Sequence, residues 1–185
     1  STRRTASQAC QRLILMLNEQ LFELFKSLED LTSLVYALLF LIVFFVEKRM
    51  SSVTVALLVL CLSKGMASLL LPDLLALASQ VGLQYKFAWY GSWMALNVIC
   101  IGLILKFHIA NQIRASNVAL AVSLAYVGFT AIQAIDFIDR ATLNSGFFAM
   151  VYQISIPTIN IGLIPLICYF WLRDYRKLTL LNKES

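Results

Sequence analysis

The chain has 185 residues, of which 60% are hydrophobic and 14% are charged, and its mean hydropathy is +0.79. Soluble domains are about 45–50% apolar and about 25% charged, so this composition excludes a disordered tail, a coiled-coil rod and an ordinary water-soluble enzyme domain. The net charge of +5 comes from Lys and Arg in tails and loops, where such residues set membrane orientation and contact headgroups. Nucleic acid is therefore not an expected partner, because no basic cluster interleaves with aromatics outside the membrane.

Residues 1–30 are predicted to contain a tail and an amphipathic helix. From Cys10 to Leu31 apolar residues recur in alternating steps of four and three, which places them on one helical face. The centre of this candidate interaction face consists of Ile14, Leu17, Leu21, Leu24 and Leu28. Such a helix lies on the membrane surface or packs against another helix, a self-associating coiled coil included. A sixth crossing is the remaining alternative, and it would place Glu19 and Glu23 in lipid at about 2.5–3.5 kcal/mol each.

Residues 31–172 are predicted to form a transmembrane bundle. A hydrocarbon core of about 30 Å requires about 20 helical residues, and five apolar runs meet or approach that length. They cover about 31–46, 52–71, 87–105, 118–137 and 147–172. Leu74–Leu83 is apolar but too short to cross, and the sequence predicts a half-helix or an interfacial turn there. The expected fold class is therefore an all-α integral membrane protein, a five-span helical bundle with an N-terminal amphipathic helix.

The distribution of basic residues predicts the orientation of the bundle. With five spans and the basic tail 173–185 in the cytoplasm, most Lys and Arg of the loops lie on the cytoplasmic side, as the positive-inside rule requires. Arg3, Arg4 and Arg12 would then lie outside, which the same rule disfavours. Compact loops and the lack of an N-x-[ST] sequon suit a bacterial inner (plasma) membrane.

Lys64 is the most informative polar residue, because ionisable groups deep in a span are rare and face protein or a wet cavity. Counting about 1.5 Å per helical residue, polar residues on three further spans fall near its depth, and Asp136 lies about 9 Å outward of it. This candidate intramembrane polar site comprises Lys64, Asn97, Gln133, Asp136 and Gln153. One hypothesis is a hydrated pocket in which Lys64 and Asp136 pair and gate a solute or a proton. One alternative is a structural network that fixes helix register. In the others, Lys64 extends to the headgroups or pairs with an acidic residue of a partner subunit.

The prolines of the spans and the polar residues at the span ends can also be interpreted from the sequence. Pro157 and Pro165 interrupt the fifth span, as a static kink or as a substrate site, whereas Pro72 is expected at a helix end. Asp136, Asp139 and Arg140 are expected to form a charged rim where the fourth span ends, an interfacial pair or a mouth that recruits cations. The lone His108 is expected to contact headgroups at a membrane edge.

Recognisable catalytic and cofactor motifs are absent from the sequence. There is one histidine, too few for a paired haem site, and no H-E-x-x-H, G-x-S-x-G, P-loop or Gly-rich dinucleotide turn. The four cysteines form no C-x-x-C pair, so we expect no metal site, no cofactor and no enzyme. The expected function is an accessory or assembly subunit of a larger membrane complex, with the lipid bilayer and a membrane protein or a homo-oligomer as partners. A small channel or transporter using Lys64 and Asp136 is the alternative.

Overall fold

The structure is a computed structural model, and it describes residues 27, 30–80, 82–142 and 147–184, with side chains to residue 177. Within these residues the chain forms five helices, each long and apolar enough to cross a membrane. The first helix spans Asp30–Glu47. The others are α2 (Ser52–Ala78), α3 (Leu83–Ala110), α4 (Asn117–Thr142) and α5 (Phe147–Glu184). The prediction of an all-α, five-span, multi-pass membrane protein is confirmed, while the amphipathic N-terminal segment lies outside the described residues.

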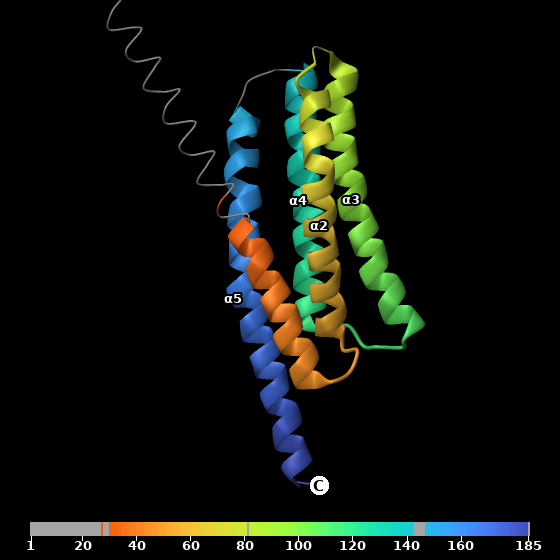
Figure 1. The fold of residues 1–185 in the computed structure, drawn as a ribbon, viewed down its shortest axis with the longest axis vertical. Coiled ribbons are helices and arrows are strands. Elements are labelled where there is room, and N and C mark those ends of the chain that lie inside the picture. The colour runs from red at the N-terminus through yellow and green to blue at the C-terminus, as the bar shows by residue number, and fades with distance from the viewer. Residues whose placement is uncertain (1–26, 28–29, 81, 143–146, 185) are drawn as a thin grey trace, which may run out of the picture.

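The helices are arranged so that α2, α3 and α4 form one packed group and α5 joins it through α4 (Figure 1). The first helix lies beside α5 and reaches only part of the way along α2 (Figure 1). The core lies where these helices meet, and its fully buried side chains include Tyr36, Leu57, Val122 and Ile167. The bundle therefore combines residues that are far apart in the sequence around one core.

Two hydrogen bonds tie the first helix to α5 in a parallel register. The Tyr36 hydroxyl donates to the carbonyl of Asn160 at 2.6 Å, and the Trp171 indole Nε1 donates to Glu47 Oε1 at 3.0 Å. Both pairs are separated by 124 positions in the chain, which is possible only if the two helices run in the same direction. Tyr36 and Glu47 are about three helical turns apart, and so are Asn160 and Trp171. The two bonding residues of each helix therefore lie on the same face of that helix.

Helix α2 is longer than the sequence predicted. It begins at the N-cap Ser51, whose side chain accepts from the Thr54 amide, and it continues through Pro72 to Ala78. The expectation of a helix end at Pro72 is wrong, and Leu74–Leu83 contains no separate half-helix, because α2 continues to Ala78. The expected turn in this stretch begins at Ser79. A proline within a helix forfeits one backbone hydrogen bond, and membrane helices tolerate this because other groups satisfy the freed carbonyl.

Helix α5 is also continuous, because Pro157 and Pro165 both lie inside it. Its C-terminal part extends past the other helices (Figure 1).

Helix α3 ends in a cap in which Gln112 adopts the left-handed conformation, with φ 52. The amide of Ile113 donates to the carbonyl of His108 at 3.0 Å, the bond that defines a Schellman cap.

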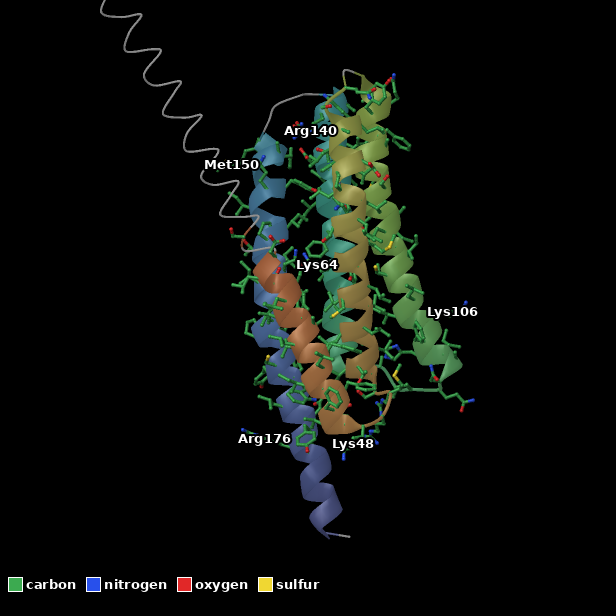
Figure 2. The ribbon with its side chains drawn as sticks, viewed as in Figure 1. Lys48, Lys64, Lys106, Arg140, Met150 and Arg176 are labelled. Carbon is green, nitrogen blue, oxygen red and sulfur yellow. The ribbon has the colours of Figure 1, made fainter. Side chains whose placement is uncertain are left out.

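The basic residues gather at one end of the bundle, which we call the basic end. There the first helix and α3 finish and α2 and α4 begin (Figure 1). Figure 2 shows Lys48, Lys106 and Arg176 at this end, Arg140 toward the other, and Lys64 between them. The aromatic residues near the start of α3 and those near the end of α5 lie at opposite ends of the bundle (Figure 1).

Candidate functional site

A series of buried polar contacts joins α4 to α3 and to α2, and we call it the polar ladder. It consists of contacts of Tyr90 with Asp136, Asn97 with Gln133 and Tyr126 with Ser63. Asn97, Gln133 and Asp136 are three of the five residues predicted for the intramembrane site. The ladder brings these three onto one interface because the buried face of α4 carries polar residues from Tyr126 onward.

The central contact of the ladder joins two of the predicted residues. Asn97 Nδ2 donates to Gln133 Oε1 at 3.0 Å, and both residues are buried. Primary amides offer two donors and an acceptor, so this pair links α3 to α4 without placing a charge in the interior. Such interhelical bonds average about 0.6 kcal/mol in membranes, so the contact specifies register more than it adds stability.

Asp136 is the one fully buried carboxylate among the described residues, with 0% of its surface exposed. The Tyr90 hydroxyl donates to Oδ2, and Arg140 Nε lies 3.3 Å from Oδ1, one turn further along α4. The Arg140 guanidinium also lies 6.0 Å from the centre of the Tyr90 ring, within reach of a cation–π contact. An exposed charged rim is therefore wrong for Asp136 and Asp139, because both are buried within the bundle, but the expected pair of Asp136 with Arg140 is present near the end of α4.

The contact between Tyr126 and Ser63 was not predicted from the sequence. The Tyr126 hydroxyl donates to Ser63 Oγ at 2.8 Å, and Cys100 of α3 is buried in the same core. Ser63 precedes Lys64, so the depth argument that selected Lys64 applies equally to it. Serine lacks the charge that draws attention in an apolar run, and nothing in the sequence indicates which side of α2 faces α4.

Lys64 and Gln153 lie in different surroundings from the other predicted residues. Lys64 is half-buried on α2, at the point where the buried face of that helix ends. Gln153 is exposed on α5. The Asp136 carboxylate contacts Tyr90 and Arg140, and pairing between Lys64 and Asp136 stays a hypothesis.

A second polar cluster lies at the basic end and includes His108. Its Nε2 lies 2.7 Å from Ser52 Oγ, and its Nδ1 lies 2.6 Å from the carbonyl oxygen of Ile104. The predicted headgroup contact of His108 is wrong, because the ring is buried against α2. The short contact with the Ile104 carbonyl requires an N–H on Nδ1, because a carbonyl oxygen only accepts.

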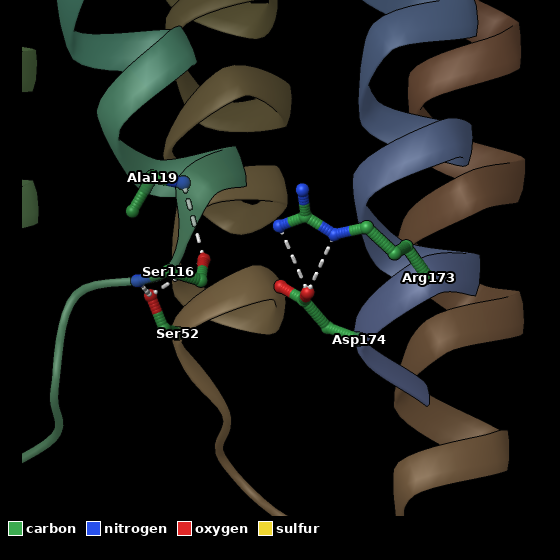
Figure 3. A network of polar contacts seen from close by, with 5 residues as sticks. All are labelled: Ser52, Ser116, Ala119, Arg173 and Asp174. Carbon is green, nitrogen blue, oxygen red and sulfur yellow. Dashed lines mark hydrogen bonds and ion pairs between the residues drawn. The ribbon is translucent and has the colours of Figure 1, made fainter. Parts of the chain in front are cut away.

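Ser52 extends this cluster to the start of α4 (Figure 3). Its hydroxyl lies 2.9 Å from Ser116 Oγ, and it accepts the Ser116 amide at 2.8 Å. Ser116 Oγ accepts the amide of Ala119 at 3.2 Å, as an N-cap residue does. Figure 3 also shows the ion pair of Arg173 and Asp174 on α5, in which Arg173 Nη2 lies 3.1 Å from Asp174 Oδ1. The cluster therefore joins one end each of α2, α3 and α4.

Trp93 adds a buried donor beside the ladder. It lies on α3 between Tyr90 and Asn97, and its indole Nε1 has no hydrogen-bond partner within the described part of the chain. Buried indole N–H groups normally find an acceptor, and this one finds none among the described residues.

Among the described residues, no group of three or more His, Cys, Asp or Glu side chains could hold a metal ion. Cys61, Cys100 and Cys168 are free thiols in partly or fully buried positions. Comparison with models of protein families, with curated proteins and with solved structures found no match to this chain. Functional inference therefore rests on the chemistry of the bundle.

Proposed function

We propose that this chain is a non-catalytic multi-pass membrane protein that acts as an accessory or assembly subunit of a larger membrane complex. The observation that supports this proposal is that polar groups of the interior bind one another. Asn97 pairs with Gln133, and Asp136 is held by Tyr90 and Arg140. Groups engaged in this way fix the register of helices, and they leave fewer donors and acceptors for a solute.

The form of the chain also supports a role in assembly. The loops between the described helices are short, so function would be carried by helix surfaces and by the ends of the bundle. Large apolar side chains are exposed along all five helices, and such surfaces contact lipid or other membrane helices. We therefore propose that these helix surfaces contact lipid and a partner membrane protein.

We further propose that the basic end faces the cytoplasm of a bacterial cell, in the inner membrane. Lys48, Arg49, Arg114, Arg176 and Lys177 are all exposed at this end, and an excess of Lys and Arg in short loops favours the cytoplasmic side. Cysteines introduced at positions 2 and 180 test this orientation. With five crossings, a membrane-impermeant thiol reagent labels position 180 only from the cytoplasmic side and position 2 only from the other.

The assembly role is tested by gentle extraction at native expression level, followed by native mass measurement and identification of the co-migrating proteins. We expect a foreign subunit in fixed stoichiometry. The double variant Leu17→Glu plus Leu24→Glu tests the candidate interaction face, and Glu19→Gln plus Glu23→Gln is its control on the polar side of the same segment. A chain that migrates alone or only with copies of itself would contradict the accessory role.

A small channel or transporter is the second candidate, and the complete burial of Asp136 favours it. A carboxylate in a membrane interior is costly and often marks an ion or proton path. Reconstituted vesicles test this candidate with Asp136→Asn and Lys64→Met. Loss of a flux in either variant, with expression and assembly unchanged, would favour transport over the accessory role.

A further inference from the structure

The basic end carries exposed cations that have no ion pair within the described part of the chain. They are Lys48, Arg49, Lys106, Arg114, Arg176 and Lys177. The acidic side chains described near this end are already engaged. Glu47 accepts a hydrogen bond from Trp171 at 3.0 Å, and Asp174 pairs with Arg173 at 3.1 Å. The counter-charge for the exposed cations is therefore expected from another molecule.

On the first helix, one of these cations follows an exposed aromatic residue along the same side. The amide of Lys48 donates to the carbonyl of Phe44 at 3.0 Å, so Lys48 lies one turn beyond Phe44. Phe45 is 67% exposed and precedes Lys48 by three residues. Residues three apart are neighbours on a helix surface, so a cation lies directly beyond a ring that faces outward.

Helix α5 repeats this arrangement with Arg176. Tyr169 and Leu172 are 61% and 45% exposed, and Arg176 is exposed as well. Steps of three and four residues place all three on one side of the helix. Each of the two helices therefore presents an apolar surface that ends in a cation.

The hydrogen bond between Glu47 and Trp171 holds the ends of these two helices together. Lys48 directly follows Glu47, and Arg176 lies five residues beyond Trp171. Figure 2 shows Lys48 and Arg176 at the same end of the bundle. The Trp171 ring lies 6.1 Å from the ring of Tyr175, and such amphipathic rings prefer the headgroup level of a membrane. The two cations beside them are therefore expected at the depth of the lipid phosphates.

The combination of cation and apolar surface limits the class of ligand. A soluble anion would contact only the cations and would leave the apolar side chains in lipid. A zwitterionic headgroup brings a cation of its own close to Lys and Arg, whereas an anionic headgroup does not. Basic residues at the ends of membrane helices attract anionic lipids in this way.

We propose that phospholipids of net negative charge bind at the paired ends of the first helix and α5. Their phosphates lie at Lys48 and Arg176, and their acyl chains lie along Phe45, Tyr169 and Leu172. The proposal goes beyond the accessory role and does not depend on it, because a subunit or a transporter can each bind lipid. It also does not depend on which leaflet contains the basic end.

Competition between two lipids tests the proposal. The purified full chain is reconstituted in vesicles that contain equal amounts of phosphatidylglycerol and phosphatidylcholine with identical acyl chains. Native mass spectrometry then counts the lipids that stay bound after release. We expect phosphatidylglycerol to be retained in excess. Lys48→Gln and Arg176→Gln should each lower that excess about fivefold, the usual contribution of one basic residue at an anionic surface.

Two control variants separate a site from general charge and from misfolding. Arg114→Gln removes an exposed arginine from the same end, but this residue lies in the connection between α3 and α4, and we expect little change in the excess. Arg176→Lys keeps the charge and should retain the excess of the original chain. A loss in Arg176→Gln together with retention in Arg176→Lys then assigns the effect to charge.

Three results would overturn the proposal. Equal losses in Arg176→Gln and Arg114→Gln would mean that the charge of the whole end attracts lipid without a site. Equal retention of the two lipids by the original chain would mean that no lipid is selected. Binding of inorganic phosphate that Lys48→Gln and Arg176→Gln abolish, without any preference between the lipids, would assign the cations to a soluble anion. None of these results changes which proteins co-migrate with the chain, so failure here is distinguishable from failure of the proposed function.

Discussion

Both halves of α2 consist mostly of apolar residues, but their surroundings are very different. From Ser52 to Ser63 nine residues are buried, and beyond Ser63 none is. The buried half contains the β-branched residues Val53, Thr54, Val55 and Val59 and the exposed half contains none, whereas leucine and small residues occur in both. Lipid is as apolar as leucine, so an apolar side chain gains no hydrophobic drive toward protein in a membrane.

The difference arises from the neighbours of each half. The first helix reaches only part of the way along α2 (Figure 1), and its position is fixed by the bonds of Tyr36 and Glu47 to α5. The buried half of α2 therefore has helices on more sides than the exposed half. The lesson is that hydropathy identifies a span, while neighbouring helices decide which part of it is core.

The strongest test of this comparison is a pair of leucine truncations in α2. Leu57 is 0% exposed and Leu69 is 73% exposed. We expect Leu57→Ala to lower the free energy of unfolding by about 2–5 kcal/mol, because the cavity loses packing contacts. Leu69→Ala should change it by less than about 0.5 kcal/mol. Unfolding in mixed micelles by titrated detergent measures both, and equal losses would contradict the difference between the halves.

The polar ladder allows a second test in the interior. We expect Asp136→Ala to lower the free energy of unfolding by about 1–3 kcal/mol, because the buried Tyr90 hydroxyl loses its acceptor. Asp136→Asn keeps an acceptor oxygen, so its loss should be smaller. Asp73→Ala, at an exposed carboxylate on α2, is the control. If Asp136→Ala is no more destabilising than Asp73→Ala in the same micelle titration, the ladder is not a stabilising element.

The position of the first helix is tested by its hydroxyl bond to α5. Tyr36→Phe removes only the bond to the Asn160 carbonyl, and we expect a loss of about 0.5–1.5 kcal/mol. Tyr169→Phe, at a residue that is 61% exposed, should be close to neutral. Thermal unfolding in detergent compares the two variants. A neutral Tyr36→Phe would indicate that the parallel register depends on packing alone.

The smallest expected effect concerns the pair Asn97 and Gln133. A double-mutant cycle of Asn97→Ala and Gln133→Ala should give a coupling energy of about 0.6 kcal/mol, typical of interhelical hydrogen bonds in membranes. The matched cycle replaces Gln133→Ala with Gln153→Ala, at an exposed residue of α5, and should give no coupling. Similar coupling in both cycles would mean that the effect is not specific to the contact.

Part of the candidate site followed from the sequence by counting depth along the spans. Asn97 and Gln133 were placed near the same level, and the structure pairs them. Depth does not specify rotation about the helix axis, however. For that reason Gln153 was grouped with them although it is exposed, and Ser63 and Tyr126 were missed although they bind each other.

The sequence by itself determined the number of spans, their approximate bounds and the basic end, because hydropathy and charge act locally against a bilayer. Only the tertiary structure decided that α2 continues past Pro72, that His108 and Asp136 are buried, and that the first helix pairs with α5. These features depend on which faces of different helices meet. An apolar span carries almost no sequence signal for that choice, because lipid and protein offer it similar surroundings.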